Sequence, residues 1–164
     1  MNVKRLRIYL DDHLALLVGE SQLAGRVRRS NTGSTLEAFL AELEAELEEQ
    51  KRELEHVIER LLGAGGGRSL KQSAAWFAEK LGRLKLNDSL VRYSPLSRLL
   101  ELQALAAAAQ ERVALWQSLE TLADNPALVD CDFTALRTIA EDRRQRLLSH
   151  CREAADEAFG AREE

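Results

Sequence analysis

The feature that most constrains the fold of this chain is a seam of apolar residues between positions 34 and 62. The seam advances by alternating steps of four and three residues, which places its members on one face of an α-helix. A single polar residue, Gln50, interrupts it. Because a polar side chain inside a buried stripe is unfavourable without a partner, Gln50 predicts polar groups opposite it. The apolar members are Leu36, Leu40, Leu43, Leu47, Leu54, Val57 and Leu61.

Start and stop signals predict four long helices and no sheet. The chain is rich in Leu, Ala, Glu and Arg and contains only two prolines, a composition typical of packed helices. Ser34 and Glu37 have the spacing of a capping box, and Ser94 followed by proline marks a second helix start. The expected helices span residues 3–29, 34–62, 94–124 and 133–160.

The lengths of the connections predict how the helices are arranged. The first two helices are joined by a few residues, as are the last two, so each pair is expected to form an antiparallel hairpin. Residues 63–93 form a long crossover between the hairpins and carry the pattern of a short amphipathic helix. We therefore expect an all-α fold, a four-helix bundle that occupies residues 1–164 as one domain.

Charge is divided unevenly along the chain. Residues 36–62 hold nine Glu against three basic residues, whereas residues 63–100 hold seven basic residues against two acidic ones. The favoured interpretation is that acidic and basic faces meet inside one molecule or one oligomer. The alternative is an anionic surface bound by the crossover, although we do not expect nucleic-acid binding. The crossover bases concerned are Lys71, Lys80, Arg83 and Lys85.

Polar residues also fall near the middle of apolar rows on the other three helices. If these rows face inward, the bundle has a belt of polar side chains at half its height, and Glu20 is expected to pair with Arg143. Since a single histidine on an apolar face is usually a hydrogen-bonded core residue, the histidines are interpreted in that way. The expected belt consists of His13, Glu20, Gln50, Gln103, Gln110, Arg143 and His150.

In helix lengths, connections and polar belt, the chain resembles the ferritin-like superfamily. That resemblance implies a dinuclear iron or manganese centre, built from a Glu on each of two helices and a Glu-x-x-His pair on each of the other two. This sequence offers Glu20, Glu53 and His56, but it has Arg144 where a second His is needed. We therefore expect no cofactor and no catalysis. The alternative is a divergent di-iron or di-manganese oxidase or an iron-handling protein.

The remaining expectations concern location and assembly. Cys131 and Cys151 lie too far apart on the expected last helix to bridge. Together with the lack of a membrane span or a secretion signal, these free thiols predict a cytoplasmic protein. Residues 76–102 resemble a segment of bacterial helical-bundle proteins, which implies a bacterial origin. Small residues at 104 and 106–109 permit close helix approach, within the bundle or across a homodimer. The expected function is self-association, as a homodimer or other homo-oligomer, or protein contact.

Overall fold

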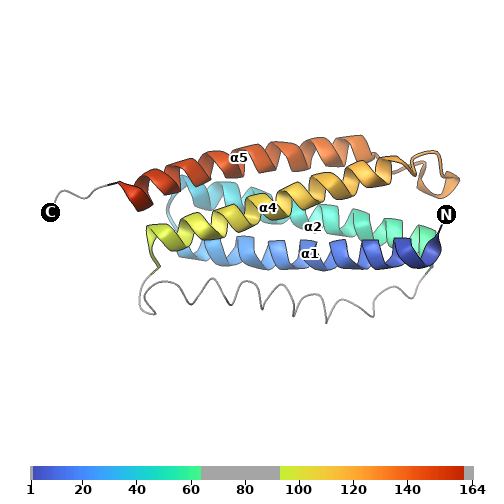
Figure 1. The fold of residues 1–164 in the computed structure, drawn as a ribbon, viewed down its shortest axis with the longest axis horizontal. Coiled ribbons are helices and arrows are strands. Elements are labelled where there is room, and N and C mark those ends of the chain that lie inside the picture. The colour runs from blue at the N-terminus through green and yellow to red at the C-terminus, as the bar shows by residue number, and fades with distance from the viewer. Residues whose placement is uncertain (1, 64–92, 161–164) are drawn as a thin grey trace.

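The computed structural model describes residues 2–63 and 93–160, and this part of the chain is all-helical (Figure 1). The fold class expected from composition and periodicity is confirmed at this level. The crossover and its amphipathic helix, expected within residues 63–93, lie almost wholly outside the described residues. The elements are α1 (Val3–Ser30), α2 (Thr35–Leu62), α4 (Pro95–Glu120), the short 3-10 helix η1 (Pro126–Leu128) and α5 (Phe133–Phe159).

Polar side chains cap the start of each long helix. Ser34 accepts a hydrogen bond from the backbone N–H of Glu37 at 3.3 Å, as the capping-box spacing predicts. The Glu37 carboxylate accepts from the N–H of Gly33 at 2.6 Å rather than from the N–H of Ser34, which donates to the carbonyl of Asn31 at 3.3 Å. The third helix was expected to continue to residue 124, but it ends at Glu120 and continues as hydrogen-bonded turns.

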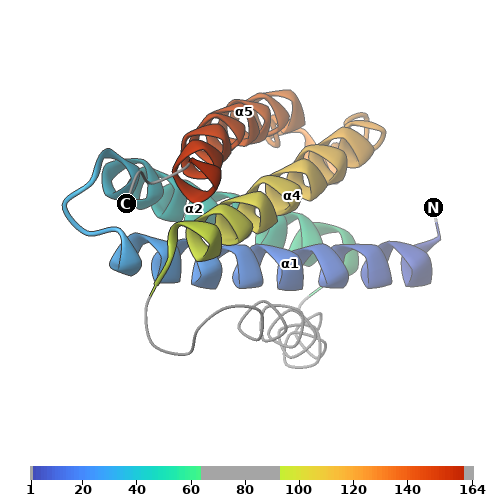
Figure 2. The ribbon, with the colours of Figure 1, turned by 60° about the vertical axis from the view of Figure 1, so that its left-hand side comes forward.

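The four long helices of residues 2–63 and 93–160 pack as two pairs that lie against each other. Helix α1 packs along α2, and α4 packs along α5, while α1 also contacts α4 (Figures 1 and 2). The guanidinium of Arg7 donates to the carbonyl of Leu62 at 3.0 Å, which brings the start of α1 to the end of α2. An ion pair between Arg98 and Glu157 likewise joins the start of α4 to the end of α5. Contact between α2 and α5 is looser than within either pair.

The leucine seam of α2 lies in the core. Its residues from Leu36 to Val57 are buried, and only Leu61 at its end is half-buried. The largest fully buried side chain is Trp116 of α4, whose ring stacks on Phe133 with 6.3 Å between centroids. None of the helices in the described ranges is long and apolar enough to cross a membrane.

Helix α4 lies between α1 and α5 and packs against both. Its small residues serve this double contact. Ala106, Ala108 and Ala109 are buried within the single chain, whereas Ala107 between them is exposed. Of the two uses expected for these small residues, close approach inside the bundle is the one that the structure shows.

Candidate functional site

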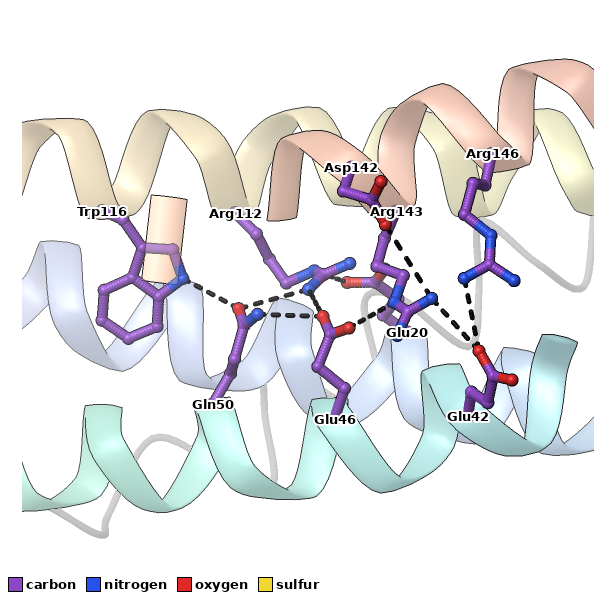
Figure 3. A network of polar contacts seen from close by, with 9 residues as sticks. All are labelled: Glu20, Glu42, Glu46, Gln50, Arg112, Trp116, Asp142, Arg143 and Arg146. Atoms are coloured by element: carbon purple, nitrogen blue, oxygen red, sulfur yellow. Dashed lines mark hydrogen bonds and ion pairs between the residues drawn. The ribbon is translucent and has the colours of Figure 1, made fainter. Parts of the chain in front are cut away.

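Three polar residues of α2 project from one helix face toward the second helix pair (Figure 3). Glu42, Glu46 and Gln50 are spaced by four residues, so their side chains lie one above another. Their burial increases along the row, since Glu42 is exposed, Glu46 is 8% exposed and Gln50 is 1% exposed. The row therefore runs from solvent into the core.

Both polar atoms of the Gln50 side chain, the interruption in the leucine seam, are hydrogen-bonded. Its side-chain oxygen accepts from the indole Nε1 of Trp116 at 2.8 Å and from Nη1 of Arg112 at 3.2 Å. Its Nε2 donates to Oε1 of Glu46 at 3.0 Å. Because these contacts replace lost hydration, the amide is tolerated in the seam.

The central cation of the network is Arg112, whose residue is only 2% exposed. Its Nη1 lies 3.1 Å from Oε1 of Glu46, and its Nε lies 2.9 Å from Oε2 of Glu20. Within the described part of the chain, neither carboxylate oxygen of Glu20 has a hydrogen-bond partner, nor do Nε and Nη2 of Arg112, so Glu20 and Arg112 meet as an ion pair without a hydrogen bond. Burial of these two groups is therefore only partly compensated.

Burial dominates the electrostatics of Glu20. The carboxyl group is 1% exposed, and desolvation raises its pKa to about 7. The adjacent Arg112 guanidinium opposes this rise, and the negative charge of Glu46 adds to it. Glu20 consequently titrates in the folded protein near neutral pH.

Two arginines of α5 complete the network on its outer side. Arg143 places Nε 2.5 Å from Oε2 of Glu46 and Nη1 3.3 Å from Oε2 of Glu42. Arg146 also reaches Glu42, at 3.3 Å, and its guanidinium lies over the ring of Phe39, 4.6 Å from the centroid. These long side chains connect α5 to α2 where the two helices pack loosely.

Part of the expected polar belt is corrected by the structure. Gln103 and Gln110 are exposed, because their row on α4 faces solvent. Arg143 pairs with Glu46 and Glu42, whereas Arg112 pairs with Glu20. The expected pairing of Glu20 with Arg143 was wrong because α1 packs against α4, and α5 packs chiefly against α4 on another side.

The two belt histidines lie apart from the network. His13 is buried at 8% exposure and packs its ring against Tyr9, with 4.4 Å between centroids. Burial lowers the pKa of His13. His150 is half-buried beside Phe39, and its Nδ1 lies 3.1 Å from Glu153. Neither position indicates a ligand or a catalytic base.

Five residues of the network were missed by the sequence reasoning, namely Glu42, Glu46, Arg112, Trp116 and Arg146. Glu46 lies four positions before Gln50, which was a usable signal for a partner on the same helix. Arg112 lies in a second row of α4 that has the same three-four spacing as the row containing Trp116, so periodicity did not single it out. Trp116 offered a second usable signal, because its indole N–H needs an acceptor when it is buried. The second row contains Leu105, Ala108, Arg112, Leu115 and Leu119.

The residues at the centre of the bundle do not fit the dinuclear metal site that the ferritin-like resemblance implies. Glu20 faces Arg112, and a guanidinium between carboxylates repels a divalent cation. Glu53 is exposed on α2. The ring of His56 points to Asp130, with 3.7 Å between Nε2 and Oδ2. The three candidate ligands therefore do not share one site.

A groove lies beside the network where α2 and α5 diverge. Its volume is about 540 Å³. Leu136 and Ile139 of α5 give it an apolar wall, and Ile139 is 42% exposed. We call it the acidic groove, because its lining contains one arginine, Arg52, and five carboxylates, Glu46, Glu49, Glu53, Asp130 and Asp132.

Comparisons of the chain with protein-family models, with curated proteins and with solved structures found no match. The chemistry of the chain's own residues therefore carries any functional proposal. The features that bear on function are the buried network and the acidic groove next to it.

Proposed function

We propose that this protein is a non-catalytic, ferritin-like helical bundle that acts by self-association or protein contact. In this proposal α1 with α2 and α4 with α5 are antiparallel hairpins, joined by the crossover of residues 63–93. The ends brought together by Arg7 with Leu62 and by Arg98 with Glu157 support this topology. The short connections support it as well.

The state of the bundle centre supports a role without catalysis. Arg112 lies between Glu20 and Glu46 and pairs with both, while Arg143 pairs with Glu46 from α5. Gln50 and Trp116 are hydrogen-bonded to each other. Polar groups that are buried and pair chiefly with one another in this way hold a packing arrangement and offer little exposed surface to a substrate.

The observation that carries the proposed contact function is the acidic groove. Four of its five carboxylates are exposed, since only Glu46 is buried and paired with arginines of the network. With the apolar wall at Leu136 and Ile139, the groove suits a basic segment that has an apolar face. The chain itself supplies such chemistry, because residues 63–100 carry seven basic and two acidic residues. We therefore take a second copy of the chain as the partner.

Multi-angle light scattering on a sizing column tests this function, with a chelator present throughout. We expect a dimer or larger assembly at low ionic strength that dissociates as salt is added, because salt screens exposed charges. Glu49→Lys, in the groove, is expected to shift the equilibrium toward monomer. The matched control Glu55→Lys changes the same charge on an exposed position of α2 outside the groove lining. A monomer at every concentration and ionic strength would refute self-association.

A further inference from the structure

Three side chains with metal-binding atoms converge at the end of the acidic groove. His56 projects from α2, and Asp130 and Cys131 lie in the link between η1 and α5. One ligand atom of each residue lies within 4.8 Å of the other two. His56 was considered from the sequence only as half of a Glu-x-x-His pair, whereas its neighbours in space are 74 and 75 positions later.

The spacing of these atoms is close to that of ligands around a tetrahedral ion. Bonds of about 2.0 to 2.3 Å at tetrahedral angles separate neighbouring ligand atoms by roughly 3.3 to 3.8 Å. Nε2 of His56 already lies 3.7 Å from Oδ2 of Asp130. Small side-chain rotations would therefore bring all three ligands into place.

The backbone that carries Asp130 and Cys131 is held against α2 by contacts within the protein itself. Leu128 is 1% exposed and anchors the link in the core. The backbone N–H of Cys131 donates to the carbonyl of Leu128 at 3.0 Å, and Arg60 donates to the carbonyl of Ala127 at 3.1 Å. Ordering the site on binding thus involves side chains more than backbone.

We propose that His56, Asp130 and Cys131 form a binding site for one borderline divalent transition-metal ion of the Zn²⁺ class. The imidazole nitrogen, one carboxylate oxygen and the thiolate supply three ligands, and a water molecule supplies the fourth. Thiolate and imidazole ligands favour such an ion over Mg²⁺ or Ca²⁺, which prefer oxygen. Binding releases the thiol proton of Cys131 to solvent.

Charged groups around the site both attract a metal ion and compete with it. Burial, followed by the negative charges of Asp130 and Glu53, raises the pKa of the Cys131 thiol, and the same negative field attracts a cation. Arg60 opposes binding, since its Nη2 lies 2.7 Å from Oδ2 of Asp130. In the metal-bound form Asp130 exchanges this guanidinium for the ion.

The test is titration of the reduced full-length protein with Co²⁺, a spectroscopic substitute for Zn²⁺. We expect saturation at one ion per chain, a thiolate-to-cobalt charge-transfer band, and loss of the band when Zn²⁺ is added. Cys131→Ser is expected to abolish the band. The matched control Cys151→Ser, on buried Cys151 of α5, is expected to keep it.

Two further variants test the other contacts. His56→Gln is expected to weaken binding by at least about tenfold, because loss of a ligand costs no less than loss of a group that orients one. Arg60→Gln is expected to tighten binding about threefold or more, since a competing cation is removed. Absence of the band, its persistence in Cys131→Ser, or unchanged binding in His56→Gln would overturn the proposed site. Unchanged or weaker binding in Arg60→Gln would overturn the exchange at Asp130.

Discussion

Replacing Arg112 by methionine tests whether its charge holds the centre of the bundle together. Methionine keeps most of the apolar length of the side chain but removes the cation and its donors. In Arg112→Met, Glu20 loses the ion pair at 2.9 Å, and Glu46 loses one at 3.1 Å. Gln50 keeps the indole of Trp116 as a donor.

The expected loss of unfolding free energy follows from the burial of these groups. The side chains of Arg112, Glu20 and Glu46 are 3%, 1% and 10% exposed, so little solvent replaces the lost contacts. Removing one partner of a buried ion pair costs about 3 to 5 kcal/mol. Glu46 retains Arg143, and Glu20 can become protonated, so we expect a value near the lower end, about 3 kcal/mol at pH 8.

Urea denaturation followed by circular dichroism measures this loss, and a second variant separates charge from packing. Arg112→Met/Glu20→Met removes both buried charges and replaces them by apolar groups. Since buried ion pairs are often no more stabilising than apolar pairs, we expect the double variant to be more stable than Arg112→Met alone. A loss below about 1 kcal/mol in Arg112→Met would refute the reasoning, as would a double variant less stable than the single one.

Two further predictions concern the same network. Burial raises the pKa of Glu20 from 4.5 to about 7, so the folded protein binds the Glu20 proton more tightly than the unfolded chain does. The stability that this proton adds is complete below pH about 4.5 and is lost as the pH rises through about 7. At about 1.4 kcal/mol per unit, this amounts to roughly 3 kcal/mol, so the stability of Glu20→Gln relative to the unmodified protein is expected to increase between pH 5 and pH 8. A difference independent of pH in urea titrations would contradict the raised pKa. Trp116→Phe keeps the ring beside Phe133 but removes the donor to Gln50, and it is expected to cost about 1 to 2 kcal/mol by the same assay. If the hydrogen bond is the cause, Gln50→Leu/Trp116→Phe loses no more unfolding free energy than Gln50→Leu alone. If instead the losses of the two single variants simply add, the hydrogen bond is excluded as the cause.

The helices could be predicted from the sequence because their signals are local. The leucine seam of α2 has one period and one buried face, and Ser34 and Ser94 mark helix starts through bonds to backbone groups three residues away. The end of α4 was placed too late, since the turns after Glu120 keep hydrogen bonds between nearby residues and differ little from helix in sequence.

The network could be predicted only in part, because its partners depend on tertiary contacts. Helix α4 has two rows with three-four spacing, one containing Trp116 and the other Arg112, and both are buried because α4 contacts α1 and α5. An expectation of one buried face per helix selects one row and misses Arg112. Gln103 and Gln110 lie in a third row with equal spacing, which faces solvent. Periodicity alone does not distinguish these rows.

The direction of the contacts indicates what the network does. Between the two helix pairs, its donors are Arg112 and Trp116 of α4 and two arginines of α5, and its acceptors lie on α1 and α2. A shift of one pair by a helical turn would move Arg112 away from Glu20 and leave the buried Glu20 carboxylate without its cation. Leaving a buried charge unpaired costs far more free energy than the correct ion pair contributes, because the net stabilisation by a buried ion pair is close to zero. The network therefore selects one alignment of the two pairs, and that alignment brings His56 of α2 to Asp130 and Cys131 of the link before α5.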